Sequence, residues 1–243
     1  MSRRRFFAPP SAFNFGKRSV TLTSDEARHL REVLRLKAGD EVQVFDGAGR
    51  EFRAVVAQAR REFAELELGD EIGSPKPESP LRLTLAVALL KGEKFDLVVQ
   101  KGTELGVNKL IPLVTRYADI RLRDDSDAAK RVTRWQRIAL EAAKQCGRSI
   151  VPQIATPTPF ASVLSENPCL MFSERDGQAL TTDLETQSVT AIVGSEGGWS
   201  DEELDQARAA KVPIVTLGGR ILRAETAAIA TAVLLQHLYG DLK

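Results

Sequence analysis

The part of the chain after Pro80 alternates apolar runs of strand length with segments of helical periodicity. Five apolar runs occupy 81–90, 109–115, 169–173, 189–194 and 212–218, and helical segments are expected near 94–105, 127–146, from 200, and at 224–239. Strands that are apolar throughout and separated by helices are typical of a parallel sheet covered on both faces. The sequence therefore predicts an α/β domain.

A break rich in proline, glycine and serine at Gly69–Pro80 interrupts the periodic pattern. Before it, short alternating runs at 41–47, 51–58 and 63–69 indicate a small β-rich domain. One helix interrupts these runs, with Ser24 expected as its N-cap and Leu30 on its apolar face. We expect domains at 1–72 and 81–243, joined by a linker at 73–80.

The overall charge is close to neutral, but the positive charge is unevenly distributed. Lys and Arg outnumber Asp and Glu by 13 to 7 in residues 1–61 and by 9 to 5 in 116–148. In the helical segment 127–146, Trp135 and Ala139 share an apolar face, while Arg131 and Arg134 are on the remainder. A nucleic-acid surface explains both zones, and a solvated helix face is the alternative.

The sequence predicts neither a metal site nor association with a membrane. Cys146 and Cys169 lack metal-type spacing, and His29 and His237 lie at opposite ends of the chain, so we expect no metal site. His237, on an apolar helix, is expected in the core or at an interface. No apolar run reaches membrane-spanning length and no secretory signal is recognisable, so we expect no membrane association and a cytoplasmic location.

Three glycines surround a carboxylate in the loop Gly194–Trp199, which follows a strand. Ser200 and Glu203 then predict a capping box at the start of a helix. The loop lacks both the dinucleotide-binding glycine spacing and a Walker lysine, and its acids would repel phosphate. Its glycines suit close approach of a flat neutral or cationic group. A tight turn whose glycines serve only the backbone is the alternative.

A second glycine pair, Gly218 and Gly219, also separates a strand from a helix. Both loops would open at the carboxyl edge of the sheet, where α/β proteins bind ligands. Arg220 and Arg223 at this loop suit RNA phosphate or a flipped base, although surface or capping roles are alternatives. Glu225 would bind a ligand or pair with Arg223.

Five motifs occur together in a recognisable order at 29–47, 91–107, 144–149, 192–203 and 217–230. As a set they resemble the bacterial 16S ribosomal RNA uracil-N3 methyltransferases of the SPOUT class. The resemblance implies a PUA-like β-barrel for RNA recognition, followed by a trefoil-knotted parallel-sheet domain that binds S-adenosylmethionine and forms a homodimer. True knots are rare, so the residues alone would not predict one.

The resemblance also implies which residues form the site. Arg220, Arg223 and Glu225 would border the point of methyl transfer. The cofactor would contact Phe172, Ser173, Gly194, Glu196, Gly197, Gly198, Leu217, Gly218, Ile221, Leu222 and Thr226. The RNA would contact seven arginines, Arg3, Arg28, Arg31, Arg35, Arg134, Arg148 and Arg175.

The sequence departs from the commonest family pattern at the two glycine loops. Ser195 and Gly219 stand where many relatives carry proline, and Ala224 replaces a frequent threonine. Without proline the loops are less preorganised, which would weaken cofactor binding.

The expected activity is methylation of N3 of a uridine in 16S ribosomal RNA or the small subunit, using S-adenosylmethionine. Because N3–H takes part in base pairing, the base must be unpaired or flipped. Arg220 or Arg223 would stabilise the uracil anion, and Glu225 and Glu196 are candidate proton acceptors. The alternative is a non-enzymatic dimeric RNA-binding or ribosome-assembly protein, which would not need the two glycine loops.

Overall fold

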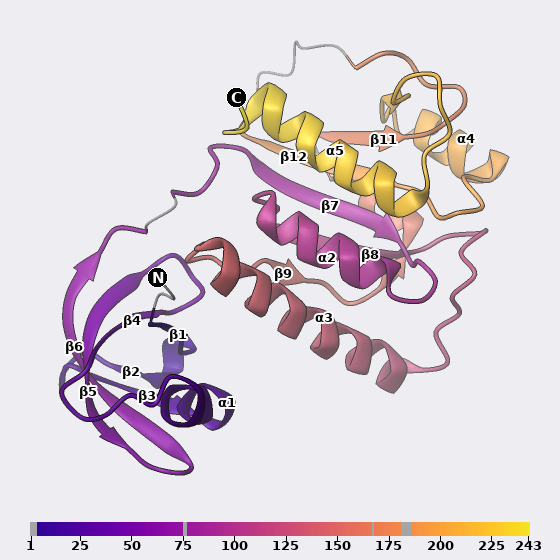
Figure 1. Cartoon of the computed structure of the whole chain (residues 1–243). Helices are drawn as coiled ribbons and strands as arrows, with labels where there is room; N and C mark the ends of the chain where they lie inside the picture. The colour runs from indigo at the N-terminus through magenta and orange to yellow at the C-terminus, as the bar shows by residue number, and fades with distance from the viewer. Residues whose placement is uncertain (1–3, 75–76, 167, 181–185) are drawn as a thin grey trace. The chain divides into compact units, whose positions relative to one another are not determined.

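The computed structural model describes residues 4–74, 77–166, 168–180 and 186–243, which form two compact units. Unit 1 comprises Met1–Glu78 together with Ala143–Val151, and unit 2 comprises Ser79–Ala142 together with Pro152–Lys243. Figure 1 labels the α-helices and most of the strands along the chain. Among the helices of the described residues, none combines the length and the apolar character that a membrane span requires.

Unit 1 is built on one six-stranded sheet in the order β1-β4-β5-β6-β3-β2. Its strands pair antiparallel, except that β1 runs parallel to β4. The strands are β1 (Arg5–Phe7), β2 (Phe13–Asn14), β3 (Ser19–Thr23), β4 (Glu41–Phe45), β5 (Glu51–Ala59) and β6 (Phe63–Ile72). The apolar residues of their alternating pattern, among them Phe6 and Leu66, form a buried core, which confirms the β-rich prediction.

Short helical segments complete unit 1: η1 (Pro10–Ala12), α1 (Ser24–Arg28) and a π-helical turn, η2 (His29–Val33). The N-cap of α1 is Thr23, so the prediction of Ser24 was one residue late. Ala27 and Leu30 are buried as their spacing predicts. The helical path ends at Arg35, whose φ is 55°, a left-handed conformation that stops helix propagation.

A buried ion pair explains why Ala143–Val151 belongs to unit 1. Arg5 donates to both oxygens of Glu51 at 2.9 Å, and its Nη2 also donates to the Arg148 carbonyl at 2.9 Å. Ser149 Oγ donates to Glu51 at 2.7 Å. Residues 148–149 therefore supply hydrogen-bond partners to both members of the buried pair, which offsets part of the cost of burying these charges.

Unit 2 contains a seven-stranded sheet in which every pairing is parallel, as the apolar strands predict. The order is β10-β8-β7-β12-β11-β13, with β9 also pairing with β8. The strands are β7 (Arg82–Ala88), β8 (Lys109–Val114), β9 (Gln153–Ile154), β10 (Thr158–Pro159), β11 (Cys169–Phe172), β12 (Ser188–Val193) and β13 (Ile214–Val215).

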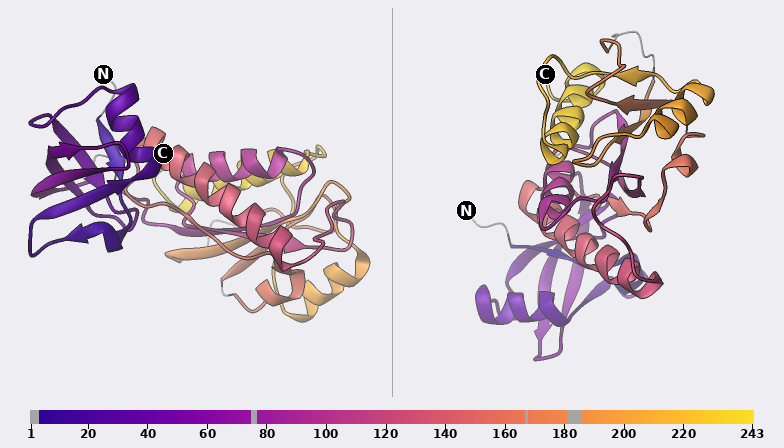
Figure 2. Two further views of the ribbon diagram at one scale, coloured as in Figure 1. Left: turned by 90° about the horizontal axis from the view of Figure 1, so that it is seen from below. Right: turned by 90° about the vertical axis from the view of Figure 1, so that its right-hand side faces the viewer.

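Helices cover both faces of this sheet (Figure 2). One face carries α2 (Lys94–Glu104), α5 (Ala224–Tyr239) and the part of α3 (Asp125–Cys146) in unit 2. The other carries α4 (Asp201–Ala209) and η3 (Phe160–Val163), which cover an apolar cluster that includes Met171 and Trp199. The predicted α/β architecture is confirmed. Because these strands are parallel, the carboxyl ends of β11, β12 and β13 lie along one edge of the sheet.

Candidate functional site

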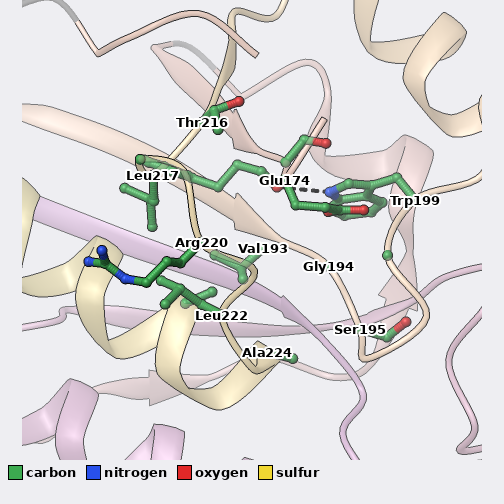
Figure 3. A pocket seen from close by; sticks show the side chains of 15 residues that line it. Glu174, Val193, Gly194, Ser195, Trp199, Thr216, Leu217, Arg220, Leu222 and Ala224 are labelled. Carbon is green, nitrogen blue, oxygen red and sulfur yellow. Dashed lines mark hydrogen bonds between the residues drawn. The ribbon is translucent and has the colours of Figure 1, made fainter. Parts of the chain in front are cut away.

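Three loops at this edge surround a cavity (Figure 3). They follow β11, β12 and β13, and β11 lies between the two strands that lead into the glycine loops. The lining residues are Phe172, Ser173, Glu174, Val193, Gly194, Ser195, Gly198, Trp199, Thr216, Leu217, Gly218, Arg220, Leu222, Ala224 and Ala227. The cavity lies at the carboxyl ends of parallel strands, which is the usual position of ligand sites in α/β proteins.

Trp199 joins two of these loops through its indole ring. Its Nε1–H donates to the Phe172 carbonyl at 2.8 Å, and its ring lies 5.0 Å from that of Phe160 between centroids. A Cβ on Gly194 would lie 3.0 Å from Trp199 Cε2, a distance that real Cβ contacts rarely reach. Gly194 is therefore required by the close approach of the indole ring. Gly198, with a φ of 70°, meets the conformational requirement of a turn.

The acids that follow the first glycine loop are engaged in local structure. Ser200 and Glu203 form the predicted capping box, with Glu203 N–H donating to Ser200 Oγ at 3.2 Å and Ser200 N–H donating to Glu203 Oε2 at 3.0 Å. Arg175 donates to the Trp199 carbonyl at 2.6 Å and lies 3.1 Å from Asp201. These contacts link the loop after β11 to the loop after β12.

The second glycine loop forms the opposite wall of the cavity. Gly218 has a φ of 69°, and Leu217 and Leu222 lie on either side of Arg220 at the cavity (Figure 3). Arg223 is the N-cap residue of α5, and its side chain makes no capping hydrogen bond. Arg220 and Arg223 are both exposed, so their guanidinium groups are accessible beside the cavity.

Glu196 and Glu225 converge on Lys94, a residue that the sequence analysis did not single out. Lys94 Nζ donates to Glu196 Oε1 at 2.8 Å and lies 3.8 Å from Glu225 Oε2. The hydrogen bond with Glu196 raises the pKa of Lys94. Burial by itself raises the pKa of Glu196, but hydrogen bonds from Lys94 and backbone groups outweigh it, so the pKa is lowered overall.

The placement of Lys94 has a recognisable sequence signal. It begins the helix that follows β7, so it stands at the same carboxyl edge as the glycine loops. The sequence left open whether Glu225 pairs with Arg223. Among the described residues, the ion-pair partner of Glu225 is Lys94 and not Arg223.

Seven of the eleven predicted cofactor-contacting residues line the cavity: Phe172, Ser173, Gly194, Gly198, Leu217, Gly218 and Leu222. The other four do not. The Glu196 side chain accepts a hydrogen bond from Lys94 instead. Gly197 packs against Tyr117, whose Cβ would lie 2.7 Å from a Cβ added at Gly197. Ile221 is 86% exposed, and Thr226 is exposed on α5. The motif does not show which residues of each loop turn toward the cavity, because that depends on packing in the folded chain.

The predicted RNA-contacting arginines differ in accessibility. Arg28 and Arg35 are exposed, Arg31 is half-buried beside Glu32, and Arg134 pairs with Asp96. Arg175 is exposed and takes part in the loop contacts described above. Arg3 lies outside the described residues.

Arg148 requires a correction. It is 6% exposed, and its Nη2 donates to Glu78 Oε2 at 2.6 Å. Because this guanidinium is buried in an ion pair, we reassign Arg148 from RNA contact to structural support of unit 1.

The histidines and cysteines lie apart from the cavity. His237 is exposed, with Nδ1 2.8 Å from the Leu242 carbonyl oxygen, so it does not lie in the core, and its place at an interface stays a prediction. It faces outward because α5 buries Ala228, Ala232 and Leu235 instead. Both cysteines are free thiols, and the described residues contain no group of His, Cys, Asp and Glu suited to hold a metal ion.

Comparison with known proteins connects this site to a family. Residues 77–236 match the RNA methyltransferase domain family, and 22–69 match the RNA methyltransferase PUA domain. A ribosomal RNA small subunit methyltransferase E of Synechocystis is 36% identical, covering 86% of this chain and 70% of the relative. Its counterpart from Rickettsia conorii is 32% identical, covering 91% of both chains.

A solved structure gives the same assignment. The ribosomal RNA small subunit methyltransferase E of Neisseria gonorrhoeae, bound to S-adenosyl methionine, superposes with a TM-score of 0.87 and 33% identity, covering 99% of this chain and 100% of the other. The chain therefore belongs to the RNA methyltransferase family that includes the ribosomal RNA small subunit methyltransferases E.

Proposed function

We propose that this protein transfers a methyl group from S-adenosylmethionine to N3 of a uridine in the 16S RNA of the small ribosomal subunit. The cavity at the carboxyl edge of the sheet is the observation that carries this proposal, because three loops of one parallel sheet enclose it. The Neisseria gonorrhoeae relative, which shares this fold, holds S-adenosyl methionine. The cytoplasm is the expected compartment, and the trefoil knot and the homodimer stay predictions.

The residues of the cavity fit a nucleoside cofactor. Val193, Leu217 and Leu222 provide apolar surface for a flat ring, and the backbone at Gly218 is open to close approach. No Walker lysine is present and acids follow the first loop, so the cavity does not resemble a polyphosphate site. When bound, the cofactor supplies an electrophilic methyl group.

The chain's own residues would prepare the uracil for transfer. N3 carries a proton in the neutral base and must give it up to a base, a carboxylate or water, before the nitrogen can accept the methyl group and leave S-adenosylhomocysteine as the second product. Arg220 and Arg223, exposed beside the cavity, would stabilise the resulting anion through O2 or O4. Arg28 and Arg35 in unit 1 would contact RNA phosphates.

Mapping of the small-subunit RNA tests the reaction. Mass spectrometry of RNA from cells lacking the protein should show the loss of one N3-methyluridine, and its return when the gene is restored. An unchanged map would overturn the proposed substrate.

Kinetics of purified variants test the arginine assignment. Arg223→Ala should lower the methylation rate by about tenfold or more, because charge stabilisation at the reacting centre is lost. Arg82→Ala is the matched control and should retain the parent rate, because Arg82 is exposed at the amino end of β7, at the opposite edge of the sheet. Equal rates for the two variants would remove Arg223 from the reaction centre.

A further inference from the structure

Lys94 connects the two walls of the cavity from outside the cavity itself. Its partner Glu196 follows Ser195, which lines the first wall, and its other neighbour Glu225 follows Ala224, which lines the second. One ammonium group therefore joins the loop after β12 to the first turn of α5. All three segments belong to unit 2.

The position of Lys94 is unfavourable for its own helix. It is the first residue of α2, where the helix dipole and the free N–H groups favour a negative charge. Glu225, by contrast, lies in the first turn of α5, where its charge is favoured. Helix stability therefore does not explain a lysine at this place, whereas two carboxylates within 4 Å do.

Glu225 depends on this lysine for charge compensation. Its Oε2 is buried and makes no hydrogen bond, and Lys94 Nζ at 3.8 Å is its ion-pair partner among the described residues. A buried carboxylate that loses its counter-ion is strongly destabilised. Glu225 is only partly exposed, so relief would require the first turn of α5 to move.

We propose that Lys94 is a positioning residue that holds the two glycine loops at the separation needed to bind the cofactor. This inference rests on the proposed function, because it assigns S-adenosylmethionine to the cavity. It gives Glu196 and Glu225 a shared role as anchors for Lys94, which differs from the proton-acceptor role considered for each from the sequence. Lys94 acts through these carboxylates and does not itself line the cavity.

Titration calorimetry with S-adenosylmethionine tests the proposal on the full-length protein. Lys94→Met should raise the dissociation constant about tenfold at pH 8. Lys101→Met is the matched control, because Lys101 lies on the same helix and forms a 2.9 Å ion pair with Glu104 away from the cavity. Thermal unfolding of each variant establishes that it is folded.

A double-mutant cycle distinguishes a loss of affinity caused by breaking the Lys94–Glu196 pair from one caused by general destabilisation of the fold. If Lys94 acts through Glu196, Lys94→Met should weaken cofactor binding much less in the Glu196→Gln background than in the parent. Equal losses in both backgrounds would overturn the pairing.

The pH dependence gives a second signature. Without Lys94, Glu196 loses a hydrogen bond that lowers its pKa, and Arg223 is the cation left near this position, so the pKa of Glu196 should rise. Lowering the pH to 5.5 should then restore part of the affinity of Lys94→Met relative to the parent at the same pH. A loss under twofold at pH 8, or a loss independent of pH, would overturn the proposal. Failure of the parent to bind the cofactor would instead overturn the proposed function.

Discussion

The substitution Trp199→Phe tests how the cavity wall is built. It keeps an aromatic ring against Phe160 but removes the 2.8 Å hydrogen bond to the Phe172 carbonyl. Leaving this buried carbonyl without its donor costs about 1 kcal/mol. The smaller ring leaves a void of roughly 40 Å³, which at ~24 cal/mol per Å³ costs about 1 kcal/mol more. We expect the free energy of unfolding to fall by about 2 kcal/mol.

The same substitution should affect binding, because Trp199 lines the cavity and holds the loop after β11. We expect S-adenosylmethionine to bind at least about fivefold more weakly, which is ~1 kcal/mol. Urea denaturation followed by circular dichroism measures the stability, and titration calorimetry measures the affinity.

Trp135→Phe is the matched control for this experiment. Trp135 is also buried, donates from Nε1 to Asp96 Oδ1 at 3.0 Å and lies 4.3 Å from the Phe95 ring, but it does not line the cavity. It should lose similar stability and keep the parent affinity. It also leaves Trp199 as the sole tryptophan, whose fluorescence should change when the cofactor is added. Equal affinities for the two variants would refute the role given to Trp199.

Three further predictions concern the loops and the thiol. Gly218→Ala should destabilise the protein by about 1 kcal/mol because its φ is 69°, whereas Gly219→Ala, with open space and no positive φ, should be neutral or slightly stabilising in thermal unfolding. Glu196→Gln should be less stable than the parent at pH 7, because folding lowers the pKa of Glu196 and the charged carboxylate therefore stabilises the folded state. Urea titrations should show the difference in free energy of unfolding between parent and variant shrinking as the pH falls below about 4.5 and through the folded pKa. Burial raises the pKa of Cys169 to about 12, so this thiol should resist alkylation at pH 8 until the protein unfolds; rapid labelling of the native protein would contradict this.

Local patterns in the sequence predicted the elements that carry the site. The apolar runs predicted the strands of unit 2, and Ser200 with Glu203 predicted the capping box, because these features depend on residues close together in the chain. The glycines at 194 and 218 marked two loops at the carboxyl edge for the same reason.

The strand order was decided by tertiary packing. The two strands that lead into the glycine loops follow each other in the chain, but β11 lies between them in the sheet, and its own loop contributes Phe172 and Ser173 to the cavity. Motif resemblance had pointed to these two residues. Periodicity within each strand contains no information about which strands will pair.

Contacts between distant residues were likewise decided only by the folded chain. Lys94 contacts Glu196 across 102 positions, and the Arg148 guanidinium is buried in an ion pair with Glu78, which lies 70 positions earlier in the chain. In the sequence, Arg148 is one more arginine in a basic segment. The sequence by itself determined the elements, the loops and their chemical character, since these follow from short-range periodicity and capping. The tertiary structure decided which charges are paired, since burial depends on neighbours that the chain brings together only on folding.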